Sequence, residues 1–130
     1  MSQESGMKAE NHFSSVLNQK GIAYAFTDDW YDFDVLGQKV EVKSCKICVR
    51  NAREKDYYRA GRFDFTSMEN RERQYNNDIW ACCIIHHNDT FMILGLFKVR
   101  ELKMKRYLRL DKLRKVHMIT LDEWLLKYNR

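Results

Sequence analysis

The segment from 30 to 43 constrains the fold more than any other part of the sequence. Apolar and polar residues alternate over 31–35 and again over 39–43, and Gly37 and Gln38 separate the two runs. Such alternation is typical of strands with one buried face. Glycine at the first position of a two-residue turn favours the type II′ geometry that joins antiparallel strands. The segment therefore predicts a β-hairpin that turns at Gly37 and Gln38.

This hairpin register predicts a cluster of charged residues on one face. Asp34 lies opposite Glu41, and Asp32 lies opposite Lys43. Opposed like charges destabilise a sheet, whereas a divalent cation held between two carboxylates would turn the repulsion into attraction. The cluster predicts a Mg²⁺ or Mn²⁺ site in which Lys43 stabilises developing negative charge or orients the attacking water, as phosphodiester hydrolysis requires. The alternative is a solvent-facing hairpin edge with an ion pair between Lys43 and Asp32.

Hydrophobic spacing and turn residues predict the other elements. The 130 residues fit one domain, 1–130, with a core at about 7–98 and a basic extension at 98–130. We expect helices at 7–20, at 66–76 with Thr66 or Ser67 as its N-cap, and at 121–128. We expect strands at 22–26, 78–86 and 91–97, and a loop at 49–64. The order of these elements indicates an α/β protein with a mixed sheet flanked by helices.

Charge is divided unevenly along the chain. Residues 1–43 hold 4 basic and 7 acidic residues, whereas 98–115 hold 9 basic and 2 acidic residues. A metal site beside a basic surface suits a polyanionic substrate, although a solvated charged segment would have the same composition. The candidate contacts with nucleic acid are Arg50, Arg53, Lys55, Arg59, Arg62, Lys103, Lys105, Arg106 and Arg109. Tyr57 and Tyr58 lie between Lys55 and Arg59 and could stack on a base.

Other features narrow the class of protein. The four cysteines, at 45, 48, 82 and 83, lack the spacing of a zinc site, so we interpret them as free thiols. No apolar run is long enough to span a membrane, and the polar N-terminal segment does not resemble a signal peptide, so we expect an intracellular, cytoplasmic protein without a membrane partner. No glycine-rich phosphate-binding loop is present, so we expect no nucleotide cofactor.

The residues of the hairpin resemble the signature of the PD-(D/E)XK nuclease superfamily, which includes restriction endonucleases and archaeal Holliday-junction resolvases. That signature is an acid, a short hairpin, and then acid-x-Lys, here Asp34 followed by Glu41-Val42-Lys43, with Phe33 in place of the proline. The resemblance covers roughly 7–98 and implies a restriction-endonuclease-like core.

The resemblance also implies roles for individual residues. Asp34 and Glu41 would bind the metal together with the carbonyl of Val42, and Lys43 would be the catalytic lysine. Glu10, in the first helix, would be a third acidic ligand. Gln74, on the helix after the motif, is a further candidate.

The resemblance and the charge pattern predict a Mg²⁺-dependent (or Mn²⁺-dependent) DNA endonuclease that acts as a homodimer, with junction or branched DNA as a candidate substrate. The alternative is a non-catalytic DNA-binding module of nuclease fold within a larger complex. Sequence alone does not separate DNA from RNA, because that choice depends on contacts with the 2′-hydroxyl.

Overall fold

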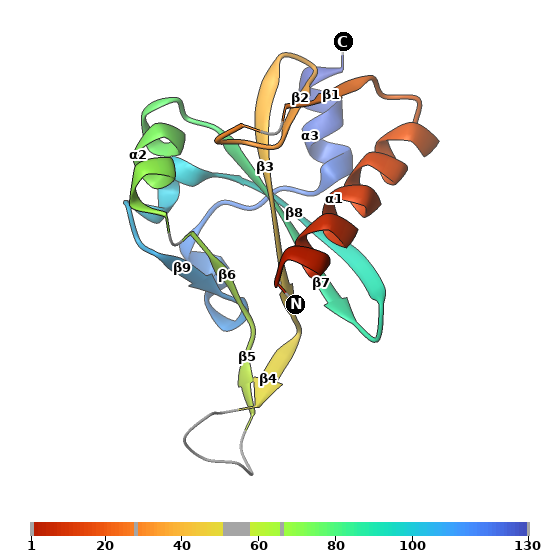
Figure 1. Ribbon diagram of the computed structural model, residues 1–130. Coiled ribbons are helices and arrows are strands. Elements are labelled where there is room, and N and C mark those ends of the chain that lie inside the picture. Colours follow the sequence, from red (N-terminus) through yellow and green to blue (C-terminus); the bar gives the residue numbers. More distant parts are fainter. Residues whose placement is uncertain (1, 28, 51–57, 66, 130) are drawn as a thin grey trace.

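A computed structural model describes residues 2–27, 29–50, 58–65 and 67–129. Its centre is a five-stranded mixed sheet in the order β1-β2-β3-β7-β8 (Figure 1). The bounds are β1 Tyr24–Phe26, β2 Phe33–Val35, β3 Gln38–Lys46, β7 Trp80–His87 and β8 Thr90–Lys98. β3 and β7 pair in parallel, and the other neighbouring strands pair antiparallel. The protein is therefore an α/β protein with a mixed sheet, as predicted.

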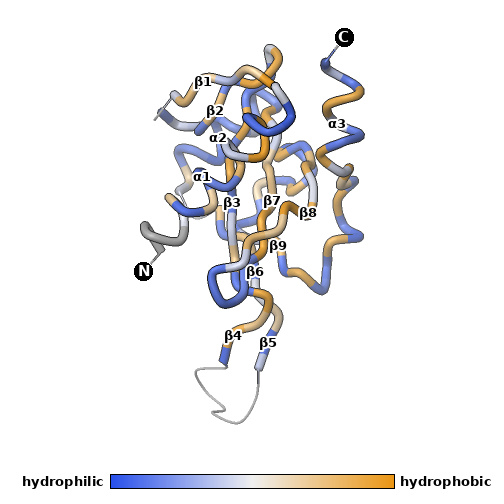
Figure 2. The backbone as a smooth tube through the Cα atoms, turned by 90° about the vertical axis from the view of Figure 1, so that its right-hand side faces the viewer, coloured by the Kyte–Doolittle hydropathy of each residue, from blue (hydrophilic) through white to orange (hydrophobic). Residues whose placement is uncertain are grey.

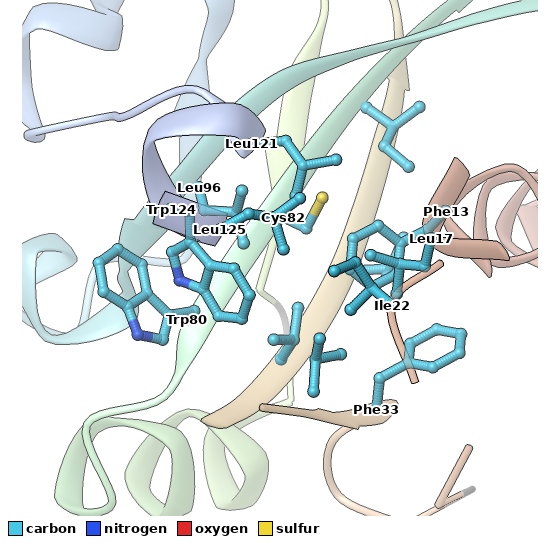
Figure 3. Close-up of a cluster of buried hydrophobic side chains, with 14 of the residues drawn as sticks. Phe13, Leu17, Ile22, Phe33, Trp80, Cys82, Leu96, Leu121, Trp124 and Leu125 are labelled. Atoms are coloured by element: carbon cyan, nitrogen blue, oxygen red, sulfur yellow. The ribbon is translucent and has the colours of Figure 1, made fainter. Parts of the chain in front are cut away.

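One face of the sheet is covered by two helices, α1 (Ser2–Gln19) and α3 (Leu121–Tyr128). Phe13 and Leu17 lie one turn apart on α1 and are fully buried against the sheet (Figure 3). Trp124 of α3 packs edge-to-face on Trp80 of β7, with 6.1 Å between ring centroids. These contacts form the first of two hydrophobic cores.

The opposite face is covered by shorter elements. They are β6 (Arg62–Asp64), α2 (Met68–Asn76), the 3₁₀-helix η1 (Val99–Leu102), β9 (Tyr107–Arg109) and the 3₁₀-helix η2 (Leu110–Lys115). β6 pairs antiparallel with β9 and sets Phe63 opposite Leu108, and both side chains are buried in the second core. A separate pair, β4 (Cys48–Arg50) and β5 (Tyr58–Ala60), projects away from the sheet (Figure 1).

β7 is the apolar strand at the middle of this arrangement (Figure 2). It lies between β3 and β8, and its residues 80–84 are all buried because both faces of the sheet are covered. No helix in the described ranges is long and apolar enough to cross a membrane.

Most predicted elements are confirmed, and two predictions need correction. Ser67 is the N-cap of α2, where its hydroxyl accepts a hydrogen bond from the Asn70 N–H. The prediction of a loop over 49–64 is wrong for its described part, which contains the end of β4, all of β5 and β6. These strands have only three residues each, and β6 depends on a partner far along the chain, so local spacing does not reveal it.

The second correction concerns the hairpin between β2 and β3. Its turn is Leu36-Gly37, with φ of 51° and 78°, and not Gly37-Gln38. Positive φ at both central residues follows the type I′ pattern and requires Leu36 to adopt a left-handed conformation. Asp34 consequently lies opposite Lys39 and not opposite Glu41. The observed register sets Asp34 opposite a lysine, and a different carboxylate, that of Asp32, lies beside Glu41.

Candidate active site

Asp32 is the carboxylate that the hairpin brings to Glu41. It lies just before β2, where its N–H donates to the carbonyl of Val40 over 3.1 Å. Its Oδ2 accepts the N–H of Val42 over 2.7 Å. The Asp32 side chain therefore lies beside Glu41, and the two side chains share a hydrogen bond. Glu41 is only 8% exposed and Asp32 is half-buried, so this acid pair is partly removed from solvent.

Gln74 of α2 orients the second acid. Its Nε2 donates to Oε2 of Glu41 over 2.5 Å and to the carbonyl of Trp30 over 3.1 Å. Gln74 is itself 2% exposed. Gln74, which was predicted as a further candidate, thus directly contacts Glu41, one of the predicted metal ligands.

Burial changes the protonation of Glu41. Desolvation, followed by the hydrogen bond and the negative charge of Asp32, raises the pKa of Glu41 from 4.5 to about 9. The positive charge of Lys43 and the hydrogen bond from Gln74 act in the opposite direction. At neutral pH and without a cation, the acid pair therefore holds a proton on Glu41.

Lys43 lies two residues after Glu41 and projects from the same face of β3. Its Nζ is 5.0 Å from the centre of the Phe65 ring, at cation–π distance. Phe65 is buried in the second core, and its N–H donates to the carbonyl of Arg106. The ammonium group is therefore held beside the acid pair by a fixed aromatic ring.

The backbone adds a third oxygen to the site. The N–H and C=O of a strand residue point toward the same side of the strand. Because the Val42 N–H bonds the Asp32 carboxylate, the Val42 carbonyl is directed to that side as well. No group of three or more His, Cys, Asp or Glu in the described part of the chain is arranged to hold a metal ion. The oxygens available for a cation here are those of Asp32, Glu41 and the Val42 carbonyl.

Asp34 belongs to a different cluster, and its predicted pairing with Glu41 is wrong. The hydroxyl of Tyr31 donates to both carboxylate oxygens of Asp34, over 3.0 and 3.1 Å. Burial and the neighbouring Asp34 raise the pKa of Tyr31. Lys39 lies opposite Asp34 and has its Nζ 5.7 Å from the Tyr31 ring. Counting pairs outward from a Leu36-Gly37 turn would have identified Asp32 as the partner of Glu41.

Glu10 lies apart from the acid pair. It lines a pocket of about 430 Å³ between α1 and the first strands, together with Tyr24 and Phe33. Phe33 faces α1, whereas Glu41 contacts α2 on the opposite face of the sheet. The structure therefore does not bring Glu10 together with Asp32 and Glu41.

The predicted nucleic-acid contacts fall into separate groups. Arg50 ends β4, and Arg59 lies on β5. Arg62 pairs with Asp64 and has its guanidinium 4.6 Å from the centre of the Tyr107 ring. Arg53 and Lys55 lie outside the described residues. A cavity of about 700 Å³ is lined by Lys103, Lys105, Arg106 and Arg109.

The cysteines are free thiols, as interpreted from the sequence. Cys45, Cys82 and Cys83 are buried and Cys48 is exposed. Burial raises the pKa of Cys45 to about 12, so this thiol stays protonated and unreactive.

No known family model matches the chain, and comparison with curated proteins and with solved structures finds none similar to it.

Proposed function

We propose that this protein is a divalent-metal-dependent nuclease that cleaves DNA, with a restriction-endonuclease-like core and a site formed by Asp32, Glu41 and Lys43. The observation that carries the proposal is the buried Glu41, paired with the half-buried Asp32 beside a lysine. A buried carboxylate beside a second carboxylate is costly unless a proton or a cation is held between them. Lys43 offsets part of the negative charge of this pair, and it would also attract a phosphate that enters the site.

The donor set fits Mg²⁺ or Mn²⁺. These cations prefer oxygen ligands and retain several waters, so two carboxylates and one carbonyl are sufficient protein ligands. The raised pKa of Glu41 is the expected property of a metal-free site, since a bound cation would replace the proton. When bound, the metal would supply an electrophile and an activated water.

The chain's own residues have distinct roles in this proposal. Asp32 and Glu41 bind the cation, and Gln74 holds the Glu41 carboxylate in a fixed orientation through its 2.5 Å hydrogen bond. Lys43 contacts the scissile phosphate and stabilises the additional negative charge of the pentavalent state. The contact with Phe65 restricts Lys43 to the region beside the acid pair.

A DNA-binding module without catalysis is the second candidate. It is favoured by the burial of Glu41, whose carboxylate already accepts a hydrogen bond from Gln74 beneath α2. A phosphodiester would have to reach this group past the helix. Action on junction or branched DNA and formation of a homodimer stay predictions from the sequence, and action on RNA stays the open alternative to DNA.

Cleavage assays distinguish the two candidates. Supercoiled plasmid and a labelled four-way junction would each be incubated with the wild-type protein in Mg²⁺, Mn²⁺ or EDTA. Glu41→Gln is the test variant, and Glu72→Gln, which removes an exposed carboxyl from α2, is the matched control. We expect metal-dependent cutting that Glu41→Gln abolishes and Glu72→Gln retains. DNA binding without cutting in either metal would refute the nuclease proposal and favour the binding module.

A further inference from the structure

The 98–115 segment forms a cavity and not merely a charged surface. η1, β9, η2 and the connection between η1 and β9 line an open cavity of about 700 Å³, a volume within the ~300–1,000 Å³ range of small-ligand sites. Six cationic side chains line it: Lys103, Lys105, Arg106, Arg109, Lys112 and Lys115. Glu101 is the one acidic residue among the lining residues, and its carboxylate accepts the N–H of His117 over 2.7 Å.

Few carboxylates balance these cations. Arg109 pairs with Asp111 over 2.8 Å. Among the described residues, no carboxylate lies within ion-pair distance of the other five cations. Several like charges around one concave space repel one another and concentrate a positive potential there. The cavity is therefore suited to an anion.

The rest of the lining is apolar and aromatic. Leu102, Leu108 and Val116 are buried and form its floor, and Tyr107 is 44% exposed at its side. Arg62 lies against the Tyr107 ring and helps to hold the ring in place. An inorganic phosphate would use the cations but neither the floor nor the ring, and it is far smaller than the cavity. A ligand that uses every part of the lining carries both a phosphate and a flat apolar ring.

The backbone at the edge of the cavity supports a role for Lys103. Lys103 and Met104 have φ of 52° and 67°, a left-handed conformation that glycine adopts at much lower cost. Strain of this kind is found at binding sites, where the side chain has a use that offsets it. At this position the lysine side chain lines the cavity.

We propose that this cavity binds one nucleotide of a single-stranded nucleic acid, with its phosphate among the cations and its base against Tyr107. This second site goes beyond the proposed nuclease site and requires neither a metal nor cleavage. The backbone connects the two regions, since Arg106 accepts the N–H of Phe65, and Phe65 lies beneath Lys43.

The test measures binding of fluorescein-labelled dT12 by anisotropy in EDTA, with the full chain and over a range of salt concentrations. The Lys112→Gln/Lys115→Gln variant should bind at least about tenfold more weakly, and two lost phosphate contacts should reduce the slope of log Kd against log salt by about 1.4. Lys8→Gln/Lys20→Gln removes the same charge from α1 and the turn that follows it, on the opposite face of the sheet, and should stay within about twofold of wild type. Equal weakening by both double variants would overturn the proposal, because net charge alone would then explain binding.

A second variant separates stacking from charge. Tyr107→Thr retains a residue suited to a strand and removes the ring, so binding of dT12 should weaken at least about fivefold with an unchanged salt slope. Unchanged affinity in a variant that melts like wild type would refute the role of the ring.

Competition experiments identify the ligand. The mononucleotide dTMP should displace labelled dT12 at lower concentrations than inorganic phosphate, and thymidine should not displace it. Inorganic phosphate as effective as dTMP would contradict recognition of a base. Binding to phosphatidylserine vesicles in place of dT12 would contradict the nucleic-acid ligand.

Discussion

The burial of Glu41 beside Asp32 makes a specific prediction for Glu41→Gln in protein freed of divalent cations. Because Glu41 is buried and its pKa is raised to about 9, the native protein carries it protonated at neutral pH. Glutamine has nearly the same shape as the protonated acid. Its NH₂ can donate to Asp32, and its carbonyl oxygen can accept from Gln74. The variant should therefore keep the fold while losing the titration of this group.

The size of the effect follows from proton linkage. In the unfolded chain the Glu41 carboxyl titrates near its ordinary pKa of 4.5. Between about 4.5 and about 9 the native wild type thus holds one more proton than the unfolded chain, so its free energy of unfolding falls as pH rises. One proton gives at most ~1.4 kcal/mol per pH unit, or up to ~3 kcal/mol between about pH 6 and about pH 8. Glu41→Gln should lack this component.

Urea unfolding followed by tryptophan fluorescence in EDTA measures the difference at both pH values. Wild type should lose stability relative to Glu41→Gln as pH rises, and the Glu72→Gln control should keep the wild-type dependence. Parallel curves for wild type and Glu41→Gln would mean that Glu41 is already ionised in the native state. That result would refute the reasoning.

Three further predictions concern the same regions. Mg²⁺ should displace the Glu41 proton, so the affinity of the protein for Mg²⁺ should rise between about pH 6 and about pH 8. Calorimetry in buffers of different ionisation enthalpy should detect nearly one proton released per cation, and no release would contradict the raised pKa of Glu41. Gln74→Leu removes the hydrogen-bond donor to Glu41, so urea unfolding should show a loss of about 1–3 kcal/mol in stability and calorimetry should show weaker Mg²⁺ binding. Unchanged stability and unchanged Mg²⁺ affinity would exclude the orienting role of Gln74. Lys103→Gly removes the backbone strain of a lysine with positive φ and should raise the melting temperature by about 3 °C while weakening the binding of dT12. A lower melting temperature would show that the backbone at this position is not strained.

Local patterns predicted most of the central sheet and its helices. The apolar spacing of α1, the Ser67 cap of α2 and the apolar strand β7 depend on neighbours in sequence, and each is found where expected. The small pairs β4-β5 and β6-β9 were not predicted. β6 is stabilised by contacts such as that of Phe63 with Leu108, which join distant parts of the chain.

The site was predicted in part. Alternation identified the face that carries Glu41 and Lys43, and this does not depend on the turn. The partner acid does depend on the turn, because moving it by one residue shifts every pair and exchanges Asp34 for Asp32. Glycine at position 37 favoured a turn that starts there, whereas the chain uses Leu36 in a left-handed conformation. Sequence preferences for that conformation disfavour leucine, so the residues of the turn did not reveal the register.

Comparison of Asp32→Asn with Asp34→Asn tests the central claim most directly. Both variants remove one carboxylate charge from the same segment, and asparagine can still accept hydrogen bonds from the Val42 N–H or the Tyr31 hydroxyl. The measurement is the rate of Mg²⁺-dependent cleavage of supercoiled plasmid. We expect Asp32→Asn to lose at least ~100-fold in rate and Asp34→Asn to stay within about threefold of wild type. Loss of cleavage in Asp34→Asn with retention in Asp32→Asn would contradict the site proposed here.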